Sequence, residues 1–260
     1  MSALDDHALA ADLAERAGHL LLTLRAGGGD PDALRKAGDR QSHEFLMAEL
    51  AMERPADAVL SEEGTDDEAR LAADRVWIVD PLDGTREFGD PGRTDWAVHV
   101  ALWARAAAAG KGDLIAGAVA LPAQNRVLST AEGAPEETSP GPGPQRPFRM
   151  VVSRTRASNL VKDVAARLNA EMVPCGSAGA KVATVITGEN DVYLHSGGFY
   201  EWDTAAPVAV ARQRGLHVSR IDGSQVVYNQ KDPLLPDILV CRPAIAPVLL
   251  NAIREATHAI

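Results

Sequence analysis

The sequence of 260 residues predicts a mixed protein in which an α+β half is followed by an α/β half. In the first half, helical patterns precede a series of consecutive strand patterns. In the second half, strand and helix patterns alternate. Between them, residues 131–147 are rich in Pro, Gly and Glu and lack periodicity, which predicts an exposed loop at a domain boundary. We therefore predict one domain at 1–147 and another at 148–260.

The first half is predicted to open with an amphipathic helix, because Leu9, Leu13, Leu20 and Leu24 fall on one stripe. Asp5 and Asp6 can cap its start, and the three glycines from Gly27 end it. A second helix is expected from about Ser42 to Glu53, with Asp39 in the turn that enters it. A single sheet is expected from the strand patterns that follow, at 58–60, 76–79, 96–102, 114–121 and 126–129.

The second half is predicted to contain four strands and four helices with a hairpin around Asp222 and Gly223. The strands are expected at 149–153, near 172–173, at 191–195 and at 237–241. The helices are expected at about 160–168, 178–187 and 203–214, and at the end of the chain.

Composition and charge exclude several classes of protein. With 46% hydrophobic and 24% charged residues, the chain is neither disordered nor fibrous. A net charge of −10 argues against a nucleic-acid polymer as partner. No apolar run approaches the roughly 20 residues of a membrane span, and the acidic first twenty residues do not fit a signal peptide. Cys175 and Cys241 are too few for a disulfide framework, which favours buried thiols in a cytoplasmic protein.

The segment Val76–Phe88 holds the densest group of reactive side chains. Its apolar strand ends in the sequence DPLDGT, which begins at Asp80. Asp80 and Asp83 can converge on one point across the proline turn, and the backbone amides of Gly84 and Thr85 can bind a phosphate if they open a helix. Taken alone, the pattern fits a simple turn equally well.

Two further acidic positions favour a metal site. Glu62 and Glu63 follow a short strand, and Asp203 follows Trp202 at the start of a predicted helix. Each alone is typical of a solvated turn or a helix N-cap. Carboxylates from three separated segments together favour a site for Mg²⁺, since this ion prefers oxygen ligands.

Other enzyme motifs do not match. The segment from Asp80 lacks the oxygen ligands and glycine position of an EF-hand, and residues 176–181 lack the Gly-Lys pair of a P-loop. Ser177 is not in a G-x-S-x-G elbow, and His195 and His217 belong to no recognisable catalytic group.

The Glu-Glu pair, the DPLDGT motif and the Trp-Asp pair, in this order, resemble the lithium-sensitive, magnesium-dependent phosphatases. This superfamily includes inositol monophosphatase, fructose-1,6-bisphosphatase and the CysQ-type bisphosphate nucleotidases. The resemblance covers nearly the whole chain. It implies a two-domain, layered αβαβα sugar-phosphatase fold, two or three Mg²⁺ ions, a small phosphate ester as substrate, and a homodimer.

The resemblance also implies roles for individual residues. It implies the metal ligands Glu63, Asp80, the carbonyl of Leu82, Asp83 and Asp203. It further implies that Asp39 pairs with Thr85 to activate the attacking water, although Lys36–Gly38 before it depart from the usual family pattern. Substrate contacts are implied for Glu63, Leu82, Asp83, Gly84, Thr85, Arg86 and Asp203.

The subfamily is indicated by the sequence DGTREF from Asp83, which is similar to the bisphosphate nucleotidases rather than to the DGTxNF of inositol monophosphatases. Residues 176–181 and 198–207 are most similar to the CysQ proteins of actinobacteria. The implied substrate is 3'-phosphoadenosine 5'-phosphate, a by-product of sulfate transfer and reduction. Arg86 and Lys181 are the nearest basic residues for its second phosphate, and a structural role fits each of them equally.

Two alternatives stay open. The same chemistry can act on inositol 1-phosphate or fructose 1,6-bisphosphate. A protein of another class, a non-catalytic sensor of phosphate ligands, would keep the metal and phosphate contacts. Asp39 and Thr85 argue against the sensor, because water activation needs them and binding does not.

Overall fold

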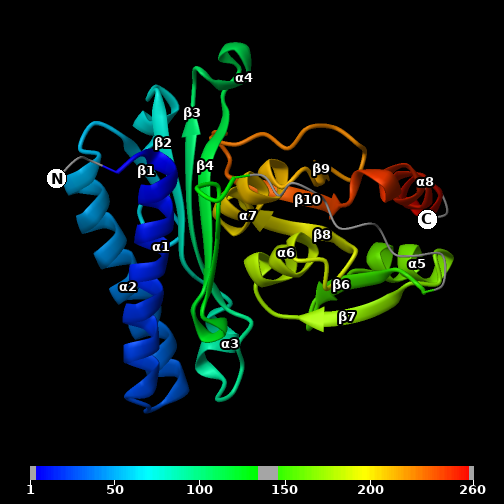
Figure 1. Cartoon of the computed structure of the whole chain (residues 1–260), viewed down its shortest axis with the longest axis horizontal. Helices are drawn as coiled ribbons and strands as arrows, with labels where there is room; N and C mark the ends of the chain where they lie inside the picture. The colour runs from blue at the N-terminus through cyan, green and yellow to red at the C-terminus, as the bar shows by residue number, and fades with distance from the viewer. Residues whose placement is uncertain (1–3, 134–145, 258–260) are drawn as a thin grey trace.

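A computed structural model describes residues 4–133 and 146–257, so most of the predicted loop at 131–147 lies outside the described residues. Helices and sheets alternate in five layers (Figure 1). This arrangement confirms the layered αβαβα fold that the family resemblance implies. Among the described helices, none combines the length and apolar composition needed to cross a lipid bilayer.

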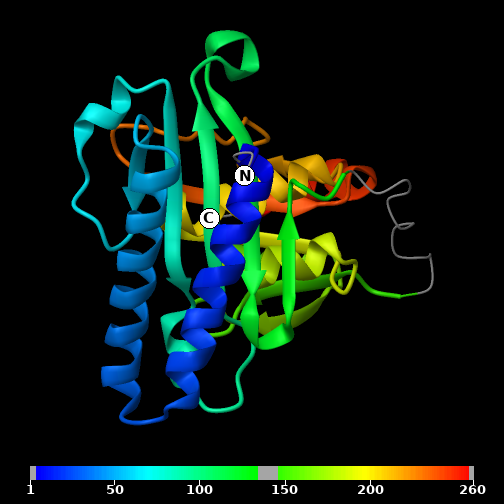
Figure 2. The same cartoon turned by 60° about the vertical axis from the view of Figure 1, so that its left-hand side comes forward.

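The first two layers come from the first half of the chain. The outer layer consists of α1 (Asp6–Ala26) and α2 (Pro31–Glu53), which lie side by side on one face of a sheet (Figure 2). That sheet has the order β1-β2-β3-β4-β5, as expected for a single sheet. Its strands are β1 (Ala58–Ser61), β2 (Arg75–Asp83), β3 (Ala97–Ala104), β4 (Asp113–Leu121) and β5 (Arg126–Ser129).

The second sheet has the order β7-β6-β8-β10-β9. Its strands are β6 (Arg149–Ser153), β7 (Glu171–Cys175), β8 (Val192–Tyr200), β9 (His217–Ser219) and β10 (Leu234–Cys241). Between the sheets lie α6 (Ala178–Ile186) and α7 (Glu201–Gln213), while α5 (Asn159–Arg167) and α8 (Ala246–Thr257) cover the outer face. Short helices are α3 (Thr85–Gly89), α4 (Ala107–Gly110), η1 (Glu68–Leu71), η2 (Pro122–Gln124) and η3 (Pro243–Ile245).

Helix α7 packs against β2, β3 and β4 although it belongs to the second half of the sequence. Its central residues, from Thr204 to Ala211, are all buried. Gly117 of β4 permits this close contact, because a Cβ atom there would lie 2.7 Å from the Cβ of Ala209 and 3.2 Å from the carbonyl oxygen of Ala206. The helix therefore forms a common core for the two sheets.

Two helices begin earlier than the sequence analysis predicted. Helix α2 starts at Pro31 rather than near Ser42, because Asp30 caps it by accepting a hydrogen bond from the Ala33 amide at 2.9 Å. Asp39 consequently lies inside α2 and not in a turn before it. Helix α7 starts at Glu201, so Asp203 is its third residue and not its N-cap.

Several strands are longer than predicted, β2 and β8 by the most residues, and the expected hairpin differs. Strand β2 continues through Asp83 with an irregularity between Asp80 and Asp83, and β8 continues to Tyr200. A tight turn does form around Asp222, whose Oδ1 accepts a hydrogen bond from the Ser224 amide at 2.8 Å. The strand that pairs with β9, however, begins only at Leu234.

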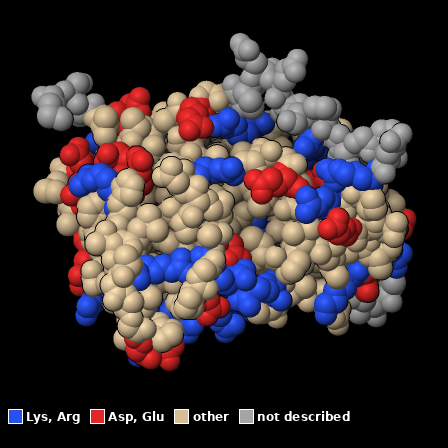
Figure 3. All heavy atoms as spheres, turned by 60° about the horizontal axis from the view of Figure 1, so that its bottom comes forward, with Lys and Arg blue, Asp and Glu red and all other residues tan. Residues whose placement is uncertain are grey.

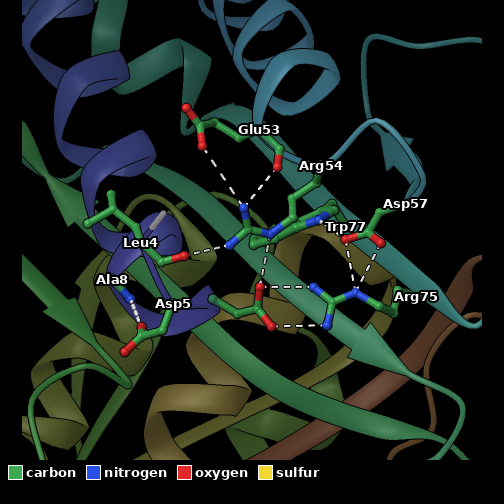
Figure 4. A network of polar contacts seen from close by, with 9 residues as sticks. Leu4, Asp5, Ala8, Glu53, Arg54, Asp57, Arg75 and Trp77 are labelled. Carbon is green, nitrogen blue, oxygen red and sulfur yellow. Dashed lines mark hydrogen bonds and ion pairs between the residues drawn. The ribbon is translucent and has the colours of Figure 1, made fainter. Parts of the chain in front are cut away.

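Polar side chains join α1, α2 and β2 at the amino end of β2 (Figure 4). Arg75 donates two hydrogen bonds to Asp6 and two to Asp57, all between 2.9 and 3.0 Å. Arg54 also donates to Asp6, at 3.1 Å. The buried indole of Trp77 donates from Nε1 to Asp57 at 2.9 Å. Asp57 therefore satisfies both a guanidinium and a buried N–H group.

Replacing Asp57 with Ala should destabilise the protein, since it leaves the Trp77 N–H group buried without an acceptor and removes an Arg75 partner. We expect a loss of about 2 kcal/mol, and a Tm lower by roughly 4–8 °C in calorimetry. Asp57→Asn, which keeps an acceptor oxygen, should show a smaller loss. A wild-type Tm for Asp57→Ala would contradict this account of the network.

Candidate active site

Three carboxylates meet between the two sheets. One ligand oxygen from each of Asp80, Asp83 and Asp203 lies within 4.8 Å of the others. Asp80 and Asp83 come from the end of β2 and are buried, whereas Asp203 comes from the first turn of α7 and is partly buried. The fold thus brings together three of the five predicted metal ligands, two from one segment and a third from more than 100 residues further along the chain.

Asp83 is held by the amino end of α6. Its Oδ2 atom accepts hydrogen bonds from Ser177 Oγ at 2.5 Å and from the Gly179 amide at 2.7 Å. Free N–H groups and the helix dipole make this end of a helix favourable for a negative charge. Because one carboxylate oxygen is engaged in this way, the other oxygen is left for a metal ion.

His99 of β3 connects Asp83 to the segment before Asp203. Its ring is fully buried, with Nε2 at 3.3 Å from Asp83 Oδ2 and Nδ1 at 3.1 Å from the carbonyl oxygen of Trp202. Burial lowers the pKa of this histidine. Gly179 makes room for the ring, because a Cβ atom there would lie 2.0 Å from His99 Nε2.

The turn after Asp80 is shaped by hydrogen bonds. Asp80 Oδ1 accepts from the Leu82 amide at 3.0 Å, and Ser42 Oγ donates to the Pro81 carbonyl at 2.7 Å. The Leu82 carbonyl, another predicted metal ligand, lies 3.1 Å from Thr85 Oγ1, whose single hydroxyl proton can be donated either to this carbonyl or to Asp39. It keeps a second lone pair that could bind a cation.

Asp39 and Thr85 lie together, as the resemblance implies. The Thr85 hydroxyl is 3.3 Å from Asp39 Oδ1. Burial and the nearby charge of Glu63 raise the pKa of Asp39 to about 6, against a smaller lowering by the Thr85 hydrogen bond. Gly38 lets α2 approach this close, since a Cβ atom there would lie 2.8 Å from Phe88 Cε1.

The clustered acids are strongly perturbed. Burial raises the pKa of Asp203 to about 7, and the charge of Asp83 acts in the same direction. Burial also raises the pKa of Asp80 well above its usual range, with further contributions from Glu62, Asp83 and Asp203. An oxygen-rich site whose acids resist ionisation together fits a divalent cation, which would offset their repulsion.

The two neighbouring glutamates are placed differently. Glu62 is exposed as a residue but borders the active-site pocket, where the partial desolvation of its carboxyl group and the nearby charges of Asp203 and Asp83 raise its pKa to about 7. Glu63, the predicted ligand, does not line that pocket. Its negative charge instead helps to raise the pKa of Asp39. The assignment of Glu63 as a metal ligand therefore stays a prediction.

The acids open into a pocket of about 460 Å³ that both halves of the chain line. Besides Gly84, Thr85 and Arg86, its wall includes residues that the sequence analysis did not single out as site residues: Arg154, Arg156, His195 and Tyr200. The run SRTR that starts at Ser153 follows a predicted strand, which is the signal that could have identified the two arginines. Lys and Arg side chains gather on the face that carries α3 and β7 (Figure 3).

The basic residues differ in their freedom to bind a phosphate. Lys181 is buried, and its Nζ atom donates to the carbonyls of Gly176 at 3.0 Å and Ser177 at 2.6 Å. Arg154 pairs with Glu87 at 2.6 Å. Arg86 and Arg156 are exposed in the pocket wall, and neither guanidinium has an ion-pair partner among residues 4–133 and 146–257.

Comparison with known proteins gives the family. Residues 7–258 match the inositol monophosphatase family. The chain belongs to this family. A 3'-phosphoadenosine 5'-phosphate phosphatase of Mycobacterium leprae is 50% identical over 257 residues, which cover 97% of this chain and 94% of the relative.

More distant family members also align with most of this chain. The 3'(2'),5'-bisphosphate nucleotidase CysQ of Escherichia coli K12 is 31% identical over 86% of this chain and 94% of its own length. The crystal structure of CysQ from Bacteroides thetaiotaomicron is similar with a TM-score of 0.75 and 28% identity, covering 90% of this chain and 96% of that one.

The raised pKa values predict how the metal-free protein responds to pH. Between about pH 4 and 7 the folded protein holds protons on Asp203 and its neighbours that the unfolded chain releases, so stability falls as pH rises. Differential scanning calorimetry in EDTA should show a Tm that declines over this range. Added Mg²⁺ should restore it most strongly at the higher pH.

Asp203→Asn should reduce that decline, because it removes one of the repelling charges. At pH 7.5 in EDTA we expect a Tm roughly 2–4 °C above wild type, and a smaller increase on addition of Mg²⁺. Asp163→Asn, an exposed acid on α5, is the matched control and should behave as wild type. An unchanged response of Asp203→Asn to Mg²⁺ would contradict its place in a metal site.

Proposed function

We propose that this protein is a Mg²⁺-dependent phosphomonoesterase that hydrolyses the 3'-phosphate of 3'-phosphoadenosine 5'-phosphate to give AMP and phosphate, in sulfate assimilation. The observation that carries the chemistry is the convergence of Asp80, Asp83 and Asp203 beside the Asp39–Thr85 pair. The choice of substrate is supported by the named activity of the mycobacterial relative.

The proposed metal ligands are Glu63, Asp80, the carbonyl of Leu82, Asp83 and Asp203, and the proposed cofactor is two or three Mg²⁺ ions. All these donors are oxygen atoms, which suits a hard cation. When bound, Mg²⁺ would neutralise the carboxylates, lower the pKa of a bound water and stabilise the phosphate oxygens. Asp83 is prepared for this role because Ser177 and Gly179 fix its carboxylate.

Asp39 and Thr85 are the proposed catalytic pair. In the proposed reaction the Thr85 hydroxyl donates its one proton to Asp39 Oδ1 and not to the Leu82 carbonyl, which turns the lone pairs of Thr85 Oγ1 towards an attacking water. A pKa of about 6 leaves Asp39 mostly ionised at pH 7 while keeping it a stronger base than an ordinary aspartate. Its position inside α2, and not in a flexible turn, fixes the pair.

The proposed phosphate cradle is formed by the amides of Gly84 and Thr85. Gly84 has a φ angle of 88°, in the left-handed region, and a Cβ atom there would lie 3.2 Å from the carbonyl oxygen of Asp95. Only glycine suits this backbone. Arg86 and Arg156 are the proposed contacts of the second phosphate, because Lys181 is bound to backbone carbonyls.

Three further properties complete the proposal. We propose a homodimer, as the family resemblance implies, which light scattering would test. The two domains are proposed at 1–147 and 148–260. A cytoplasmic location agrees with Cys175 and Cys241, neither of which forms a disulfide.

Phosphate release tests the proposed function. With Mg²⁺, we expect kcat/KM for 3'-phosphoadenosine 5'-phosphate to exceed that for inositol 1-phosphate and fructose 1,6-bisphosphate by at least tenfold. EDTA should abolish the activity and Li⁺ should lower it. Asp83→Asn should be inactive, Asp39→Asn should lose about 100-fold in kcat, and Asp163→Asn should retain wild-type rates.

Other outcomes would select the alternatives. A preference for inositol or fructose phosphate would keep the mechanism and reject the nucleotide as substrate. Binding of all three esters without turnover in Mg²⁺, measured by calorimetry, would identify a phosphate-ligand sensor instead.

A further inference from the structure

An exposed aromatic ring borders the active-site pocket. Tyr200 is 45% exposed and lines the pocket. It is the only exposed aromatic side chain among residues 4–133 and 146–257. The other two tyrosines, Tyr193 and Tyr228, are buried in the core. Core packing therefore explains those two rings and leaves the position of Tyr200 unexplained.

The ring of Tyr200 stacks on one aromatic neighbour. It stacks on Trp202 with 4.7 Å between the ring centroids and 11° between the planes. The described aromatic residues form no other ring contact with it. One face of the phenol is thus covered by Trp202, and the exposed fraction of the residue leaves the opposite face available to a planar ligand.

The position of this ring is tied to the metal-binding acids. Tyr200 is the last residue of β8, and its backbone amide donates to Asp203 Oδ2 at 2.6 Å. The carbonyl of Trp202 is bonded to His99, which also lies 3.3 Å from Asp83. These contacts therefore link the strand end, the helix start and the acids.

We propose that the open face of Tyr200 stacks on the purine base of the substrate and makes the enzyme prefer nucleotides to base-free phosphate esters. This inference rests on the proposed function and names the residue that recognises its base. An aromatic ring can stack on the π face of a base without hydrogen-bond readout. The exposed cation of Arg156 in the same pocket can bind the phosphate of the same nucleotide.

The test compares Tyr200→Ala and Tyr200→Phe in the full chain at fixed Mg²⁺. Tyr200→Ala should raise KM for 3'-phosphoadenosine 5'-phosphate about tenfold with kcat within twofold, since loss of a base stack costs affinity of this order. Its KM for inositol 1-phosphate should not change. Tyr200→Phe, which keeps the ring, should resemble wild type for both substrates.

Leu234→Ala is the matched control. Leu234 is exposed and is the cross-strand partner of Tyr200, but it does not line the pocket. This variant should leave both KM values unchanged. An equal rise in KM for both substrates in Tyr200→Ala would show a disturbed strand end, and an unchanged KM for the nucleotide would also reject the stacking.

A binding measurement separates this inference from the proposed function. AMP titrated in Mg²⁺ should bind wild type and Tyr200→Phe about tenfold more tightly than Tyr200→Ala, even if the nucleotide substrate is not turned over. Equal AMP affinities would overturn the role of Tyr200. Failure of wild type to hydrolyse 3'-phosphoadenosine 5'-phosphate would overturn only the proposed function.

Discussion

Repulsion between buried carboxylates is the constraint on which this fold depends. Asp80, Asp83 and Asp203 lie close together, and burial with the neighbouring charges raises the pKa of Asp80 and of Asp203. The protein supplies part of the compensation for this repulsion from its backbone: Leu82, Gly179 and Tyr200 each direct an N–H group at one of the three acids. A divalent cation would supply the rest. Strand β2 and helices α6 and α7 each deliver an acid or a donor to this site.

The carboxylates of Asp83 and Asp203 have different hydrogen-bond partners. Asp83 is held by the amino end of α6, which offsets its charge before any ion binds. Asp203 receives a single backbone hydrogen bond and is held at a pKa of about 7 by burial. Metal binding and the proton released from this region are consequently linked in one equilibrium.

Much of the architecture could be predicted, because amphipathic stripes and apolar runs are local features of the sequence. The single first sheet, the alternating second half and the meeting of Asp80, Asp83 and Asp203 all follow from motifs and strand ends. The start of α2 was missed because the cap Asp30 follows a glycine run that also fits a loop. Arg156 was missed although the run SRTR at a strand end offered a signal. Tyr200 could not be recognised in advance, since its relevance comes only from the tertiary contacts that place it in the pocket.

The position of α7 has a consequence for dissecting this chain. The helix is encoded in the second half, yet its buried residues pack on β2, β3 and β4 of the first. A fragment ending at residue 147 would leave that sheet face in water, and the complementary fragment would expose the small apolar residues of α7. The two pieces are thus suited to reassociation, as in a split reporter, and poorly suited to separate expression.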